Sequence, residues 1–142
     1  MLEVKQIEKG IVIDHIKSGN GLKIFNKLML NKSKKPIVLL MNVESKLLGK
    51  KDIIKIENSF DIDLNLLGLL DDNITVNYIE NGKLTLKKKI TIPKEVKGLI
   101  KCKNPRCITN SDSYVEPLFK LLSKDTLEYK CSFCEEITKY EL

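Results

Sequence analysis

Hydrophobic residues in the first third of the chain follow strand periods in some segments and a helix period in another. Residues 10–16 and 52–58 are rich in β-branched residues and predict strands, and the apolar run at 37–43 predicts a buried strand. Between the segments 10–16 and 37–43, apolar residues recur every three or four positions over residues 22–30. That spacing predicts a short amphipathic helix.

The next thirty residues repeat this alternation. A small helix is predicted at 63–70, with Asp61 or Asp63 as its N-cap. Residues 74–80 read as a strand, and the Asn-Gly pair at 81–82 is the strongest hairpin turn signal in the chain. The return strand runs to about residue 92.

The predicted order is strand, helix, strand, strand, helix, strand, followed by an extra hairpin strand. This β-α-β-β-α-β order is typical of a ferredoxin-like α/β sandwich, which makes the fold class α+β. Both helices are expected on one face of the sheet. The other face is then free for a ligand or a partner.

Four cysteines in the last third are spaced Cys102-x4-Cys107-x23-Cys131-x2-Cys134. Two close pairs joined by a long spacer predict a tetrahedral structural Zn²⁺ site, one ion per chain. Two disulfides or four free buried thiols are the alternatives. Four thiolates leave no open coordination position, so this zinc is expected to hold structure and not to catalyse a reaction.

The cysteines belong to a second, small all-β unit of zinc-ribbon type. Strands are predicted at 114–122, where Pro117 marks an edge or a break, and at 127–130, and residues 137–142 are expected to close the unit. Residues 93–98 are expected to connect the two units. We therefore divide the chain into residues 1–97 and 98–142.

Composition narrows the functional classes. The chain has 142 residues and a formal net charge of +6, with Arg106 as the only arginine. Lysines are spread along the chain without interleaved aromatic residues, so nucleic-acid binding is an alternative and not the first interpretation. The longest apolar run is too short to span a bilayer, and the first residues lack the apolar run of a signal peptide, so we expect a cytoplasmic protein.

Few residues outside the cysteines carry recognisable chemistry. His15 is the only histidine and follows Asp14. Neighbouring residues of a regular strand point to opposite faces, so these two are not expected to form a dyad. The lysine run that begins at Lys87 reads as a solvated strand edge, and no glycine-rich phosphate loop is present.

Three segments resemble a known family. They are Gly-Ile-Val-Ile-Asp-His-Ile at 10–16, Gly-Lys-Lys-Asp-Ile-Ile-Lys-Ile-Glu-Asn at 49–58 and Thr-Val-Asn-Tyr-Ile at 75–79. With the paired-cysteine tail, they resemble the regulatory chains of aspartate carbamoyltransferase, in order and over nearly the whole length. The resemblance implies a non-catalytic subunit of pyrimidine biosynthesis. It would bind nucleoside triphosphates such as ATP, CTP and UTP in a ferredoxin-like domain, pair with itself through that domain, and hold a catalytic chain through the zinc domain.

The resemblance also implies residue roles. Asp14 and His15 match contacts to the ribose and phosphates, Lys55 matches a contact to the ribose and base, and Lys87 matches the lysine that holds the triphosphate. The remaining matches are base-pocket and further nucleotide contacts: Val4, Ile7, Val12, Asn77 and Ile79. A zinc-ribbon nucleic-acid-binding protein is the main alternative, and a metalloenzyme is a third class.

Overall fold

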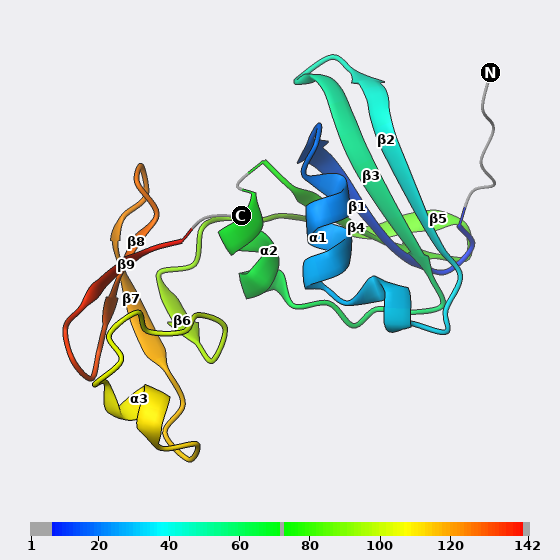
Figure 1. The fold of residues 1–142 in the computed structure, drawn as a ribbon. Coiled ribbons are helices and arrows are strands. Elements are labelled where there is room, and N and C mark those ends of the chain that lie inside the picture. Colours follow the sequence, from blue (N-terminus) through cyan, green and yellow to red (C-terminus); the bar gives the residue numbers. More distant parts are fainter. Residues whose placement is uncertain (1–6, 72, 141–142) are drawn as a thin grey trace.

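The chain folds into two sheet-based units joined end to end (Figure 1). The computed structural model describes residues 7–71 and 73–140. A five-stranded sheet with two helices on one face makes the first unit, and a four-stranded sheet makes the second. The predicted α+β class is confirmed.

The first sheet has the strand order β2-β3-β1-β4-β5, and each neighbouring pair is antiparallel. One helix connects β1 to β2 and the other connects β3 to β4, which is the ferredoxin-like arrangement. The hairpin strand β5 extends the sheet at one edge. The strands are β1 (Gly10–Lys17), β2 (Ile37–Ser45), β3 (Gly49–Glu57), β4 (Thr75–Glu80) and β5 (Lys83–Lys89).

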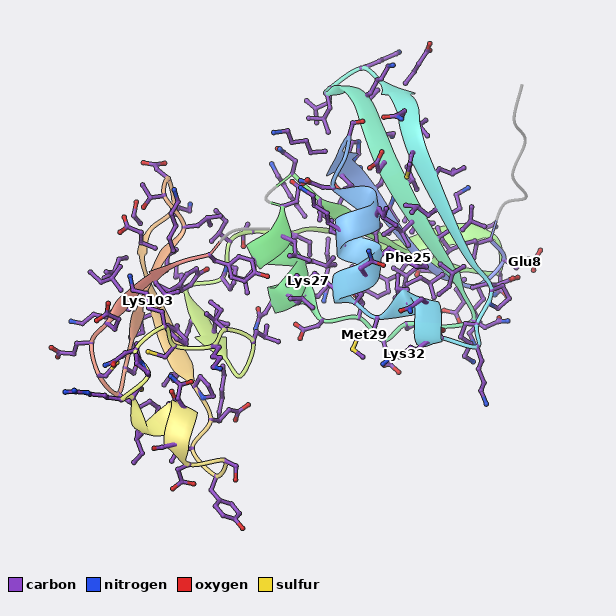
Figure 2. All side chains as sticks on the ribbon, in the orientation of Figure 1. Glu8, Phe25, Lys27, Met29, Lys32 and Lys103 are labelled. Carbon is purple, nitrogen blue, oxygen red and sulfur yellow. The ribbon has the colours of Figure 1, made fainter. Side chains whose placement is uncertain are left out.

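Helices α1 (Gly21–Lys27) and α2 (Leu64–Leu70) cover one face of this sheet, and a 3-10 turn, η1 (Leu30–Lys32), follows α1. Their apolar sides pack on fully buried strand residues such as Ile11 and Ile54. Phe25 adds a partly buried ring from α1 (Figure 2). The first core therefore lies between the helices and the sheet, and the opposite face carries no helix.

Two local signals are confirmed. The Asp63 side chain caps α2 by accepting a hydrogen bond from the Leu66 backbone N–H at 3.0 Å. Asn81 and Gly82 turn the β4–β5 hairpin with φ values of 54° and 74°. Positive φ at both central residues matches the right-handed twist of the paired strands.

The prediction that residues 37–43 form a buried strand is wrong. β2 is an edge strand, and its residues are half-buried or exposed, including Met41 at 54% exposure. A continuous apolar run fits both a central strand and the edge of a sheet, so its composition did not distinguish them.

Asp52 on β3 is a buried carboxylate that joins three parts of the first unit. Its Oδ2 accepts the backbone N–H groups of Gly19 at 3.1 Å and Gly21 at 2.8 Å, and its Oδ1 accepts that of Asn42 at 3.0 Å. The side chain thus ties the β1–α1 turn to the irregular middle of β2.

The second unit is a four-stranded antiparallel sheet in the order β6-β7-β8-β9, with Phe119 and Tyr129 fully buried in its core. The predicted strand at 114–122 begins only at Leu118, because Pro117 cannot donate to a ladder. A short helix that was not predicted follows the second cysteine. The elements are β6 (Glu95–Lys97), α3 (Ile108–Ser111), β7 (Leu118–Ser123), β8 (Glu128–Cys131) and β9 (Ile137–Lys139).

The predicted connection at 93–98 contains a strand. β6 pairs with β7, and its Val96 is fully buried in the second core. β6 therefore hydrogen-bonds within the second sheet although it precedes the predicted boundary after residue 97.

The junction between the units is packed closely around α2. Leu69 of α2 is buried in the second core, and Tyr140 packs against both cores. The neighbouring Gly68 has no room for a side chain, since a Cβ there would lie 2.3 Å from the Thr91 carbonyl oxygen and 2.9 Å from Pro93 Cδ.

We therefore expect Gly68→Ala to lower the free energy of unfolding by about 1–3 kcal/mol, as overpacking does. In an unconstrained helix the same change would stabilise by roughly 0.5–1 kcal/mol, so the sign of the effect tests the close approach. Urea denaturation measures it. Asn65→Ala, at an exposed position of the same helix, is the control and should not destabilise. A stabilised Gly68→Ala would show that α2 does not contact the connection.

Among the described residues, none of the helices is long and apolar enough to cross a membrane.

Candidate metal centre and effector cavity

The first cysteine pair lies in a loop that closes on itself. Arg106 donates its backbone N–H to Asn104 Oδ1 at 3.0 Å, which makes the turn between Cys102 and Cys107. The Asn110 side chain, from α3, donates to the carbonyl oxygens of Cys102 at 2.8 Å and Asn104 at 2.7 Å. The short helix α3 thus fixes the loop that presents both sulfurs.

The second pair comes from the end of β8. Cys131 is the last residue of that strand, and a tight turn follows it, in which Glu135 donates its backbone N–H to the Cys131 carbonyl at 2.9 Å. Glu135 adopts a positive φ of 65° in this turn. Cys134 is then directed back toward the first loop.

The four Sγ atoms lie within 4.8 Å of one another. Two pairs join the two loops: Cys102 to Cys134 at 3.5 Å, and Cys107 to Cys131 at 3.7 Å. A disulfide needs about 2.05 Å, whereas four sulfurs at about 2.3 Å from one zinc ion stand about 3.8 Å apart. The sulfur geometry fits a tetrahedral metal site, and all four cysteines are free thiols in this structure.

The surroundings of the four thiols are unequal. The Thr109 hydroxyl lies 3.1 Å from Cys107 Sγ and, by donating to it, lowers the pKa of that thiol to about 7. Burial raises the pKa of Cys102 to about 12. Metal binding must therefore displace protons from some of these thiols, which makes affinity fall as the pH is lowered.

The second candidate site lies on the helix-free face of the first sheet. Directly opposed residues of neighbouring strands share a face, and Lys55, Val12, Asn77 and Lys87 form one such row across β3, β1, β4 and β5. Four of the residues expected to contact a nucleotide are thus brought onto one face by the register of the sheet.

A cavity of about 300 Å³ lies over this row. Its lining includes six of the nine expected residues, and Ile53 and Gly82 complete it. The six are Ile7, Val12, Asp14, Lys55, Asn77 and Ile79. His15 and Lys87 are described but do not line the cavity, and Val4 lies outside the described residues.

Asn77 contributes a hydrogen-bonding group with no protein partner. Its side-chain oxygen Oδ1 is buried and accepts no hydrogen bond. An unpaired buried amide oxygen costs about 1–3 kcal/mol. Turning the Asn77 side chain toward a hydrogen-bond donor in the cavity would recover this energy.

His15 departs from the regular strand geometry. It adopts a φ of 60° at an irregularity of β1, between Ile13 and Ile16. The expectation that Asp14 and His15 point to opposite faces is therefore wrong: Nδ1 of His15 lies 4.0 Å from Oδ2 of Asp14. The period-2 rule fails here because an inserted residue breaks it.

Lys51 is a site residue that the sequence interpretation missed. Its ammonium group contacts Asp14 Oδ1 at 2.9 Å, and its side chain is 17% exposed. The signal was present, since Lys51, Ile53 and Lys55 alternate along β3 with the buried residues at 52, 54 and 56. The same alternation identifies Ile53.

The lysine run at the end of β5 divides between two faces. Lys87 lies opposite Asn77 and Lys89 lies opposite Thr75. Lys88 lies on the other side, 5.9 Å above the centre of the Tyr78 ring. The helix-free face of the first sheet therefore carries two lysines of β5, Lys87 and Lys89, beside the cavity.

Comparison with known protein families matches each of the two units to a domain of the same family. Residues 2–91 match the model of the aspartate carbamoyltransferase regulatory chain allosteric domain, and residues 94–142 match that of its metal-binding domain. The two models divide the chain just before β6.

The similar curated proteins carry the same name, "Aspartate carbamoyltransferase regulatory chain". Those of Clostridium acetobutylicum and Clostridium tetani are both 52% identical to this chain, over 98% of it and over 95% and 97% of their own lengths. That of Bifidobacterium longum is 41% identical over 97% of the chain and 99% of its own length. With both units matched and the metal-site geometry in place, the chain belongs to the family of aspartate carbamoyltransferase regulatory chains, which are non-catalytic subunits with a metal-binding domain.

Proposed function

We propose that the first unit binds nucleoside triphosphate effectors in the cavity on the helix-free face of its sheet. The observation that carries this proposal is the cavity over the row of Lys55, Val12, Asn77 and Lys87, which combines apolar side chains, a side-chain amide and lysines on one face. The exocyclic amine of adenine or cytosine can donate to an amide oxygen once the Asn77 side chain turns toward the base, and apolar side chains such as Val12 and Ile79 can pack on the base. ATP and CTP are therefore the effectors to test first.

Charge supports the same assignment. Lys55 lines the cavity, Lys51 lies within contact of Asp14, and Lys87 and Lys89 extend from the neighbouring strand. Lysine is a compact positive charge suited to phosphate oxygens. Asp14 and His15 adjoin this cationic group, where a ribose hydroxyl can find an acceptor.

We expect Lys87→Ala to weaken ATP binding by about 1.5–3 kcal/mol, because it removes a charge-assisted hydrogen bond to the triphosphate. Isothermal titration calorimetry on the metal-loaded chain measures the change. Lys88→Ala is the matched control: it removes the same charge one residue away, on the opposite face. Equal ATP affinity in wild type and Lys87→Ala would contradict the assignment.

We propose further that the metal is one Zn²⁺ per chain, held by Cys102, Cys107, Cys131 and Cys134. An all-thiolate, tetrahedral donor set suits zinc. Lysines in and beside the two loops bring positive charge near the four thiolates, and one of them, Lys103 (Figure 2), also lies 3.6 Å from the Glu136 carboxylate. The ion would hold the two loops together and leave no position for a substrate.

The second unit is proposed to dock on the catalytic chain, and the first to pair with a second regulatory chain. Exposed apolar side chains near the metal site, such as Ile108 and Phe133, suit a protein interface. In the first unit, β2 and β5 are the edges of the sheet, and they expose Met41, Leu84 and Leu86. Effector binding and partner binding would then lie on separate units, as a heterotropic regulator requires.

A further inference from the structure

The four cysteines of the metal site differ in how far solvent can reach them. Cys102, Cys107 and Cys131 are at most 2% exposed and belong to the second core. Cys134 packs against that core but is only half-buried, and its neighbour Phe133 is 50% exposed. Oxidation of a cysteine follows its exposure as well as its thiolate character. An oxidant dissolved in water therefore meets Cys134 first.

The two sulfur contacts that the structure makes both cross from one cysteine loop to the other. Cys134 Sγ lies 3.5 Å from Cys102 Sγ, and Cys131 Sγ lies 3.7 Å from Cys107 Sγ. A disulfide bond needs about 2.05 Å, so the sulfurs of Cys134 and Cys102 must approach by about 1.5 Å to form one. Each of these two pairs would form a disulfide that joins the loops.

Backbone hydrogen bonds hold each loop in its present shape. In the first loop, Cys107 donates its N–H to the Asn104 carbonyl at 3.1 Å, and in the second, Glu135 donates to the Cys131 carbonyl at 2.9 Å. A disulfide within one loop would have to be accommodated inside these turns. A disulfide between the loops shortens a contact that already exists and leaves both turns as they are.

We propose that the metal site is also a redox switch, in which oxidation by a peroxide replaces the metal link between the loops with a Cys102–Cys134 disulfide. The proposal rests on the proposed metal site and goes beyond it. The Cys134 thiolate attacks hydrogen peroxide, the O–O bond breaks, hydroxide leaves, and a sulfenic acid forms. The Cys102 thiolate then attacks that sulfur, the S–O bond breaks, and a second hydroxide leaves. Two thiolates lose two electrons in total, and one peroxide gains them.

Disulfide formation and metal binding exclude each other at this site. The metal ligand is the thiolate, so one disulfide removes two of the four ligands. The two residues that it joins are 32 positions apart, and a cross-link over a long loop restricts the unfolded chain more than one over a short loop. The oxidised second unit should therefore stay folded without its metal, and a dithiol reductant should return it to the metal-binding form.

The test uses the full chain, reduced and loaded with Zn²⁺, with its metal content measured by elemental analysis. Hydrogen peroxide is added in steps while a chromophoric chelator reports released Zn²⁺. Peptide mass spectrometry follows the cysteines, with dimedone as the trap for sulfenic acid. We expect dimedone on Cys134 first, and then one Cys102–Cys134 disulfide for each ion released. Dithiothreitol followed by Zn²⁺ should restore the original mass and metal content.

A chain stripped of metal by a chelator, under reducing conditions and without peroxide, is the control. NMR should show its second sheet unfolded, whereas the oxidised, metal-free chain keeps that sheet. A first disulfide within one loop, Cys131–Cys134 or Cys102–Cys107, would overturn the proposal. Metal release with sulfinic acid at Cys134 and no disulfide would do the same. A purified chain without metal would count against the metal proposal alone, because the disulfide mapping does not need the ion.

Discussion

Replacing Cys131 with alanine is expected to abolish metal binding and to unfold the second unit. Cys131 is fully buried at the end of β8, and its sulfur lies 3.7 Å from that of Cys107. Structural zinc contributes on the order of 10–16 kcal/mol to small metal domains, more than the second core can replace. Elemental analysis and NMR of the second sheet measure the loss.

The same variant separates the two proposed roles of the chain. The first unit has its own core, so the Cys131→Ala protein should still bind ATP while it no longer sediments with a catalytic chain. Ser132→Ala, the next residue in the same turn, is the control and should keep both properties. A Cys131→Ala chain that remains in complex with a catalytic chain after complete zinc loss would exclude the second unit as the interface.

Asp52→Ala is expected to destabilise the first unit strongly, although Asp52 is a polar residue. It leaves three backbone N–H groups without their acceptor, two in the β1–α1 turn and one in β2. The Gly21 N–H is buried and costs about 1–3 kcal/mol when left unpaired, whereas water can partly replace the carboxylate at the exposed Gly19 and Asn42, so the free energy of unfolding should fall by roughly 2–3 kcal/mol. That is a large share of the 5–15 kcal/mol typical of a folded domain.

Two aspartates provide a graded comparison by urea denaturation. Asp63→Ala removes the N-cap of α2 and should cost about 1 kcal/mol. Asp61→Ala, at an exposed position whose carboxylate makes no hydrogen bond or ion pair among the described residues, should stay within about 0.5 kcal/mol of wild type. An Asp52→Ala chain no less stable than Asp63→Ala would contradict the structural role of this carboxylate.

Local sequence signals predicted the elements of the first unit well. The β-branched run of β1, the Asp63 cap and the Asn81–Gly82 turn each depend on neighbouring residues alone, and each is confirmed. The cysteine spacing likewise predicted which four sulfurs meet.

What the sequence could not show depends on distant contacts. The irregularity at His15 becomes visible only when β1 pairs with β3, and the edge position of β2 only when the strands are ordered. The sequence predicts Val96 in a connection, and only its pairing with β7 shows that it belongs to a strand. The cavity at the junction of the two units is lined by four segments spread from Lys17 to Leu127, so no local sequence pattern predicts it.

The order of the two units along the chain has a consequence for biosynthesis. All five strands of the first sheet end by Lys89, and the last metal ligand, Cys134, follows 45 residues later. At roughly 5–20 residues per second, a ribosome needs about 2–9 s to add that stretch, and N-terminal domains generally fold first. The first unit can therefore be complete before the chain acquires the ligands for its metal, so metal supply governs the last folding step of a newly made chain.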